Sequence, residues 1–361
     1  MLLLFALLLA APASAAPVRD AAWASALRPG EITALPAGLY RGPWSLSAGV
    51  HLRASPGAIL EGGDPVLAIH GSGVTVEGLT VRASGRVGIS AIEANGTSLV
   101  DVHISGGAIG LQARTGSLSW SGGGAERSSK YGLWLQGLKV TLSRLSLQHH
   151  RGPALYLGHV AATLRDLLIT DSEYGLLTFE SELKMFHSQF RNLQRAGVGL
   201  NLTSGELSDN EFDGPFGEAA LAISSARAMV LRNNHLVHSG SIGIKVIHST
   251  VTLANNQISG ARSDSGGLEG DGLYSNNSQL DSSNDRLTDN SGASVSIMGG
   301  KASFKDCRIE GSGQAAAAVS GHGELSLSGC TITNGSAELM VSPGSILNNE
   351  NLNPQGLNTN P

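Results

Sequence analysis

The sequence predicts an all-β solenoid, in which one chain winds into a stack of short parallel strands. Three observations lead to this prediction: an internal repeat of about 22 residues, two-residue apolar alternation inside each unit, and a composition rich in turn-forming residues. The 361 residues include 48 glycines and are 41% hydrophobic, but only 4% are aromatic. This composition disfavours a helical bundle and suits many strands joined by tight turns.

The first 15 residues, "MLLLFALLLAAPASA", are predicted to be a secretory signal peptide. An apolar run is followed by Ala13, Ser14 and Ala15, the small-residue pattern of a cleavage site. The run is too short to span a bilayer, and no later segment resembles a transmembrane helix. We therefore expect cleavage near Ala15 and a mature chain that is secreted or periplasmic, with no membrane span.

The formal charge of the chain is −5 and is unevenly distributed. Residues 82–165 carry nine Lys/Arg against three Asp/Glu, whereas residues 166–292 carry eight against sixteen. Such asymmetry is typical either of a binding surface or of ordinary solvated faces. No stretch is basic enough to indicate a nucleic-acid partner.

The repeat becomes visible when the segments are aligned on one turn position. This position recurs at intervals of 21–24 residues, with one longer interval of 29. It is occupied in order by Leu79, Val102, Gly123, Leu145, Leu167, Ser188, Asn210, Asn234, Asn256, Asp285, Cys307 and Cys330. A unit of this length holds two or three strands and winds once around a solenoid, but it is too short for a propeller blade. The chain is therefore predicted to have about 12 coils.

Asparagine occupies the aligned position in three consecutive units, as in "VTLANNQISG" (251–260). In a parallel coil, equivalent positions stack about 4.8 Å apart. Asparagine amides at this spacing can donate to and accept from the copies above and below. We expect Asn210, Asn234 and Asn256 to form a structural ladder without a catalytic role.

The two cysteines, Cys307 and Cys330, take the same position in neighbouring units. Two interpretations remain open. An oxidising compartment would allow a disulfide, because the expected spacing falls within the range that a bridge can span. Alternatively, two stacked buried thiols fill core volume.

The segment "LRPGEITALPAGLYRGPWSL" (27–46) resembles the opening segment of the pectate-lyase-like superfamily, in which a "pG…lpaG.Y.G" pattern precedes the first coil. The repeat resembles the generic bacterial branch of that superfamily, which includes NosD-like proteins. The resemblance covers roughly residues 20–345. It implies a single-stranded right-handed parallel β-helix of about 12 coils, with an N-terminal capping helix formed by "DAAWASAL" (20–27).

The resemblance also sets the expected domain boundaries. The β-helix domain is expected to span residues 16–345. The Asn/Pro-rich segment that follows (346–361) is expected to be a disordered tail.

In catalytic members of the superfamily, the substrate lies across the face whose strands carry a "GIxI" pattern. On the corresponding strands here, Trp134 and Tyr156 are adjacent in one outward column, with Arg114 and Gln136 beside them. An aromatic pair flanked by Arg and amide donors suits stacking on sugar rings and orientation of hydroxyls or carboxylates. The alternative is an aromatic stack that only covers the sheet.

A second cluster surrounds the one long unit, whose insertion (259–272) brings acidic residues near outward basic and phenolic groups. Lys and Tyr can act as base and acid in β-elimination from a uronate, and carboxylates can hold a cation such as calcium. The candidate catalytic residues are Lys245, Tyr274 and Asp271. Asp264 and Glu269 are weaker candidates for a metal site. The alternative is a solvated loop with an incidental mixture of charges.

Several family motifs are absent from the sequence. The paired aspartates of polygalacturonases, the outward aspartates that hold calcium in pectate lyases and the Asp-Pro-His-Asp motif of alginate epimerases are not found. Two functions therefore remain open. One is an exported protein that binds an acidic polysaccharide and, if it is an enzyme, cleaves or epimerises it. The other is a non-catalytic envelope scaffold, adhesion or periplasmic maturation protein of the NosD-like type.

Overall fold

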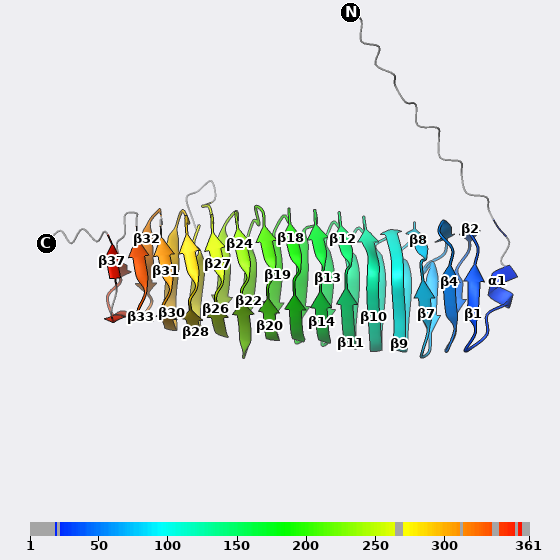
Figure 1. Ribbon diagram of the computed structural model, residues 1–361, viewed down its shortest axis with the longest axis horizontal. Helices are drawn as coiled ribbons and strands as arrows, with labels where there is room; N and C mark the ends of the chain where they lie inside the picture. The colour runs from blue at the N-terminus through cyan, green and yellow to red at the C-terminus, as the bar shows by residue number, and fades with distance from the viewer. Residues whose placement is uncertain are drawn as a thin grey trace, which may run out of the picture.

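The computed structural model describes residue 19 and residues 22–263, 270–310, 313–333, 339–350 and 353–355. It shows an all-β, right-handed parallel solenoid of about 14 turns with almost no helix, drawn out into a rod (Figure 1). The predicted fold class is therefore confirmed. The strands form three parallel columns along the rod, and each turn of the chain contributes one strand segment to each column.

The first column precedes the ladder turn. Its strands are β1 (Ile32–Leu35), β4 (His51–Ala54), β7 (Thr75–Glu77), β9 (Val87–Gly106), β10 (Ile109–Glu126), β11 (Tyr131–Ser143), β14 (Ala161–Arg165), β17 (Glu182–Phe186), β20 (Ser204–Ser208), β23 (Met229–Arg232), β26 (Thr250–Ala254), β28 (Leu273–Ser283), β30 (Ala293–Lys305), β33 (Glu324–Ser328) and β36 (Ile346–Glu350). The longer strands β9, β10, β11, β28 and β30 bend through a turn and belong to more than one column.

The second column follows the ladder turn and consists of short strands. In addition to the ends of β9 and β10, it contains β2 (Gly38–Arg41), β5 (Ala58–Glu61), β8 (Thr80–Ala83), β12 (Ser146–Gln148), β15 (Leu168–Thr170), β18 (Gln189–Arg191), β21 (Glu211–Asp213), β24 (His235–Val237), β27 (Gln257–Ser259), β29 (Arg286–Thr288), β31 (Arg308–Glu310), β34 (Thr331–Thr333) and β37 (Asn353–Gln355).

The third column carries the "GIxI" pattern. In addition to the beginnings of β9, β10, β11, β28 and β30, it contains β3 (Trp44–Leu46), β6 (Leu67–His70), β13 (Pro153–Gly158), β16 (Tyr174–Phe179), β19 (Ala196–Asn201), β22 (Ala219–Ser224), β25 (Ile242–Ile247), β32 (Ala315–Ser320) and β35 (Leu339–Val341).

The core is a set of aliphatic rows that run along the rod. In β14 the residues alternate between exposed and buried, so that Ala162 and Leu164 point inward. Register then places like side chains on top of one another: Leu142, Leu164, Met185 and Leu207 are consecutive in one buried row. Because every turn repeats this pattern, burial of apolar surface between neighbouring turns stabilises the whole length.

The N-terminal end of the rod is covered by the short helix α1 (Ala22–Ser25). Its buried Trp23 lies with its ring centroid 4.9 Å from that of Trp44 and 6.2 Å from that of Tyr40, edge-on to the latter. The predicted capping helix is confirmed and is about one turn long. It shields the first rung from solvent.

The solenoid has more turns than the 12 predicted, because the alignment missed turns at its N-terminal end. The strands β1 to β6 form two turns ahead of Leu79, and their turns carry Pro36 and Pro56. At the other end, β36 and β37 continue the stack past residue 345, where a disordered tail was expected.

No described helix is long and apolar enough to cross a membrane.

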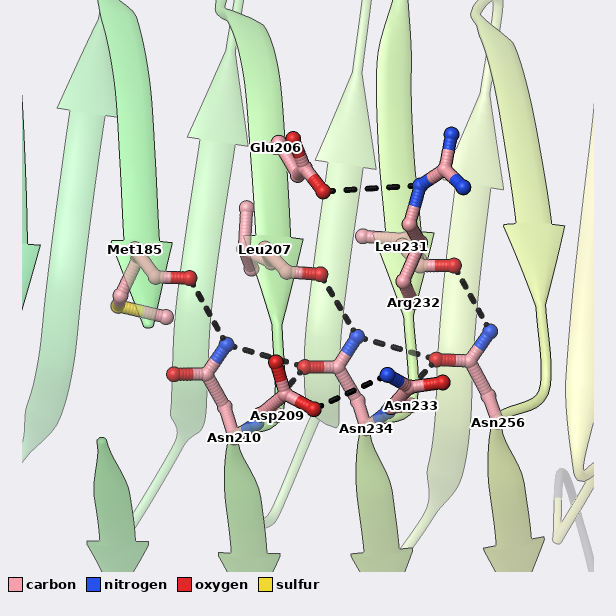
Figure 2. Close-up of polar contacts among 10 residues, drawn as sticks. All are labelled: Met185, Glu206, Leu207, Asp209, Asn210, Leu231, Arg232, Asn233, Asn234 and Asn256. Carbon is pink, nitrogen blue, oxygen red and sulfur yellow. Dashed lines mark hydrogen bonds and ion pairs between the residues drawn. The ribbon is translucent and has the colours of Figure 1, made fainter. Parts of the chain in front are cut away.

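The asparagine side chains hydrogen-bond as a continuous ladder at the turn between the first and second columns (Figure 2). The Asn210 amide nitrogen donates to Asn234 Oδ1 at 3.0 Å and to the Met185 carbonyl at 3.2 Å. The Asn234 amide repeats both contacts, with Asn256 Oδ1 at 3.0 Å and the Leu207 carbonyl at 2.9 Å.

The ladder ends at Asp285, whose carboxylate accepts a hydrogen bond from Asn256. The Asn256 amide nitrogen donates to Asp285 Oδ1 at 2.9 Å, and the Ser282 hydroxyl donates to Asp285 Oδ2 at 2.6 Å. Burial raises the pKa of Asp285, while these hydrogen bonds oppose the rise. Cys307 and Cys330 follow in the same position as free, buried thiols.

Candidate functional site

The outer face of the third column carries two rows of outward side chains, aligned rung by rung. The first row contains Gln112, Trp134, Tyr156, Leu177, Gly199, Ala222, Lys245 and Tyr274. The second row contains Arg114, Gln136, Gly158, Phe179, Asn201, Ser224, Ile247 and Asn276. Strand alternation fixes these rows, because the residues between them point into the core.

Trp134 and Tyr156 form an aromatic pair on neighbouring rungs. Their ring centroids are 6.4 Å apart and their planes differ by 8°. Tyr131 extends the cluster, with its ring 5.8 Å from that of Tyr156. Gly158 makes room for the Tyr156 ring, since a Cβ atom added there would lie 3.2 Å from Tyr156 Cε1. The phenol ring therefore lies along its own strand, over the glycine.

Arg114 is held against this aromatic pair. Its guanidinium carbon lies 4.3 Å from the centroid of the Trp134 ring, which is cation–π geometry. Among the described residues, no carboxylate forms an ion pair with Arg114. Gln136 lies beside it on the next rung, half-buried. The structure thus presents an exposed cation and an amide next to two aromatic rings.

A trough runs from Tyr156 to Lys245 along the same face, with a volume of about 390 Å³. Its floor lies over Gly199 and Ala222, where the first row has almost no side chains. Side chains on the flanking rungs form its walls: Tyr156, Leu177, Phe179, Lys245 and Ile247. Gly199 and Ala222 are consecutive small residues in the first row, and this is the feature of the sequence that corresponds to the trough. No cavity was predicted from this feature.

Lys245 and Tyr274 lie at the far end of the trough on adjacent rungs. Lys245 is half-buried and, among the described residues, has no acidic partner. The Tyr274 hydroxyl accepts a hydrogen bond from the Asn276 amide at 3.2 Å and donates toward Met298 Sδ at 3.3 Å. The proximity of the two strands brings together the two residues predicted as base and acid.

Asp271 lies in the turn before β28. Its Oδ1 accepts a hydrogen bond from the Ala293 amide at 2.8 Å, and its main-chain carbonyl accepts one from Gly243 at 3.0 Å. These contacts brace the turn between neighbouring rungs, and its role as an acid stays a prediction. Asp264 and Glu269 lie outside the described residues. In the described part of the chain, no group of three or more His, Cys, Asp or Glu residues is placed to hold a metal ion.

Residues 175–332 match a family model described as right handed beta helix region. No curated protein matches the sequence. Among solved structures, a PL6 alginate lyase in complex with a trisaccharide is similar with a TM-score of 0.51 and 12% identity, over 90% of this chain and 85% of that chain.

Two further structures have lower similarity scores. The periplasmic alginate epimerase AlgG has a TM-score of 0.47 and 10% identity, over 85% of this chain and 79% of that chain. PfbA, a surface adhesin of Streptococcus pneumoniae, has a TM-score of 0.42 and 9% identity, over 88% of each chain. At these identities the similarity concerns the fold.

Proposed function

We propose that this chain is an exported protein that binds an acidic polysaccharide along the outer face of the third column. One observation carries the proposal: two cations without acidic partners among the described residues, Arg114 and Lys245, stand at opposite ends of one continuous surface. Six rungs separate them, which corresponds to about 29 Å. An extended polymer with repeated negative charges can place one charge near Arg114 and another near Lys245.

The side chains between the two cations suit a carbohydrate. Tyr156 and Trp134 provide apolar ring surface for the C–H groups of sugar rings. Gln136, Asn201 and Ser224 provide donors and acceptors for hydroxyl groups. The fold supports this proposal as well, since a structure of the same architecture was solved as an alginate lyase with a bound trisaccharide.

Cleavage or epimerisation is the second candidate function. The adjacent rungs of Lys245 and Tyr274 favour it, because a base and an acid on one side of a uronate ring are the groups that β-elimination needs. In this reaction Lys245 would remove the proton next to the carboxylate and Tyr274 would protonate the leaving oxygen. Asp271 remains a third catalytic candidate, and calcium bound near Asp264 and Glu269 would neutralise the substrate carboxylate.

The proposal is tested by titrating the chain from Ala16 onward with polygalacturonate, alginate and a neutral glucan, with and without calcium, by isothermal calorimetry. We expect the polyuronates to bind, with affinity that falls as salt rises, and the neutral polymer to bind more weakly. Arg114→Ala and Lys245→Ala should each weaken binding about tenfold, equivalent to about 1.4 kcal/mol.

Lys184→Ala is the matched control, because Lys184 is an exposed lysine on β17 in the first column. It should leave polyuronate binding unchanged. Equal loss in all three variants would indicate a general charge effect and contradict a site on the third column. No binding to any polymer would favour the scaffold or maturation alternative.

Catalysis is tested in the same samples by following the ultraviolet absorbance of unsaturated uronates and the release of reducing ends. If product forms, Lys245→Ala and Tyr274→Phe should abolish it. Full activity in Lys245→Ala would exclude the catalytic assignment.

A further inference from the structure

The middle of the trough is unusually apolar for a surface that binds sugars. Over Gly199 and Ala222 the walls are the side chains of Leu177 and Phe179 on one side and Ile247 on the other. Leu177 leans over the floor, since a Cβ atom added at Gly199 would lie 2.7 Å from Leu177 Cδ2. The polar side chains of this stretch, Asn201 and Ser224, lie in the second row.

The apolar middle of the trough does not match an unsubstituted uronate ring, although the aromatic and polar surface around it does. A uronate ring carries hydroxyl and carboxylate groups around its edge, and each of them needs a hydrogen-bond partner once water is removed. Leu177, Phe179 and Ala222 provide none. A ligand segment that carries an apolar substituent would instead gain from burial against these side chains.

We propose that the trough binds the acyl groups of an O-acylated acidic polysaccharide, an inference that rests on the proposed function. The trough is continuous with the aromatic pair at one end and with Lys245 at the other, so a polymer held by Arg114 and Lys245 passes directly over it. Acyl esters add an apolar group to such a polymer without removing its carboxylates. The ester carbonyl oxygen accepts from Asn201 or from Lys245.

The volume and charges of the trough favour this occupant over a membrane lipid. A cavity of about 390 Å³ that is open along the rod holds short acyl groups on a chain lying lengthwise. The flanking Arg114 and Lys245 are placed for anions at both ends, which fits a polymer with repeated carboxylates.

The test compares polygalacturonate with the same polymer after chemical O-acetylation, titrated against the full exported chain. The wild-type protein should bind the acetylated polymer about tenfold more tightly, as expected for apolar groups that enter an apolar pocket. Ala222→Trp places a large ring in the trough and should reduce the affinity ratio between the two polymers to near one.

Ala318→Trp is the matched control, because Ala318 occupies the same row three rungs beyond Lys245 and outside the trough. It should keep the tenfold ratio, and the thermal unfolding midpoint of both variants verifies their folding. Equal wild-type affinity for the two polymers would overturn the acyl-group inference and leave polysaccharide binding intact. A ratio that survives in Ala222→Trp would also overturn it. No binding to either polymer would overturn the proposed function itself.

Discussion

At the scale of single residues, the paired asparagines of this chain have two different roles. Asn234 is buried and its amide joins the ladder, whereas Asn233 is exposed and has a φ of 52°. Asn255 and Asn256 divide the roles in the same way, with a φ of 59° at Asn255. Asparagine tolerates left-handed backbone better than most residues, and its amide also suits stacking.

Replacement of Asn234 by alanine should destabilise the fold strongly. The Asn210 amide would lose its acceptor and the Leu207 carbonyl its donor, in a buried site. We expect the free energy of unfolding to fall by about 2–4 kcal/mol, measured by urea denaturation. The control is Asn233→Gly, which keeps the left-handed turn and should change stability by less than about 0.5 kcal/mol. Similar losses in both variants would contradict the division of roles.

His150 makes the stability depend on pH. It is buried, its Nδ1 accepts from the Ser128 amide at 3.2 Å, and its Nε2 donates to the Ala125 carbonyl at 3.1 Å. Burial lowers the pKa of His150 from 6.5 to about 4. The unfolded chain therefore takes up a proton at a higher pH than the folded chain, so acid favours unfolding.

We expect this histidine to reduce the free energy of unfolding progressively between pH 6.5 and about 4, by roughly 3 kcal/mol in total. His150→Gln cannot titrate and should flatten the pH dependence in this interval. The measurement is urea denaturation at a series of pH values for both proteins. An unchanged slope in the variant would mean that other groups cause the dependence.

At the scale of elements, one turn of the solenoid combines a large buried ring with a glycine that the neighbouring rung requires. Trp120 occupies a buried row between Leu99 and Leu142, and its indole N–H donates to the Gly122 carbonyl at 2.9 Å. In the same turn Gly123 has no side chain, and a Cβ atom there would lie 2.0 Å from the Val102 carbonyl oxygen. The main chain of the preceding rung therefore requires a glycine at this position, where φ is 84°.

Cys307 and Cys330 are coupled across adjacent turns. The pairing of Arg308 with Thr331 places the two thiols on neighbouring rungs, about 4.8 Å apart at their backbones. The proximity of the two thiols lowers the pKa of Cys330 and, together with burial, raises the pKa of Cys307. This spacing lies within the range that a disulfide bridges.

We expect the pair to close when the protein is incubated with oxidised glutathione. The two thiols would lose two hydrogens and form one S–S bond, while each equivalent of oxidant is reduced to two thiols. Intact mass and peptide mapping under non-reducing conditions measure the change, and Cys307→Ser is the control that cannot close. An unchanged wild-type mass would favour the alternative of permanently stacked thiols.

At the scale of the whole molecule, each turn contacts only the turns beside it, so stability is a sum of local terms. The ends are then the weakest points, and α1 covers one of them through Trp23. Toward the other end, β36 pairs with β33, and Ile346 on β36 is 50% exposed.

Trp23→Ala should therefore loosen the N-terminal turns and leave the middle of the rod intact. Removing a buried tryptophan typically costs about 3–5 kcal/mol. Amide hydrogen exchange should accelerate in β1 to β3 but not in β16 or β19. Trp134→Ala removes a half-exposed tryptophan and should not change exchange at the N-terminus. Faster amide exchange along the entire rod would contradict the idea that each turn is stabilised only by the turns beside it.

The sequence alone determined the solenoid, the unit length and the rows of side chains on each face. Period-two alternation and a 21–24-residue spacing are local properties, and stacking repeats them without change. For the same reason the ladder position of Asn210 and the adjacency of Trp134 and Tyr156 were predictable. The sequence alignment missed the two N-terminal turns that carry Pro36 and Pro56, because their turn residues differ from those of the later units.

Only the tertiary structure decided what the side chains in those rows contact. Tyr156 lies over Gly158, Leu177 leans over Gly199, and Arg114 packs on Trp134. The trough results from these rotamers acting across several rungs, and no spacing in the sequence specifies them. The carboxylate of Asp271 likewise braces a turn because the Ala293 amide of the next rung happens to face it. Periodicity fixes which residues are neighbours, but side-chain packing between neighbours fixes the shape of the surface.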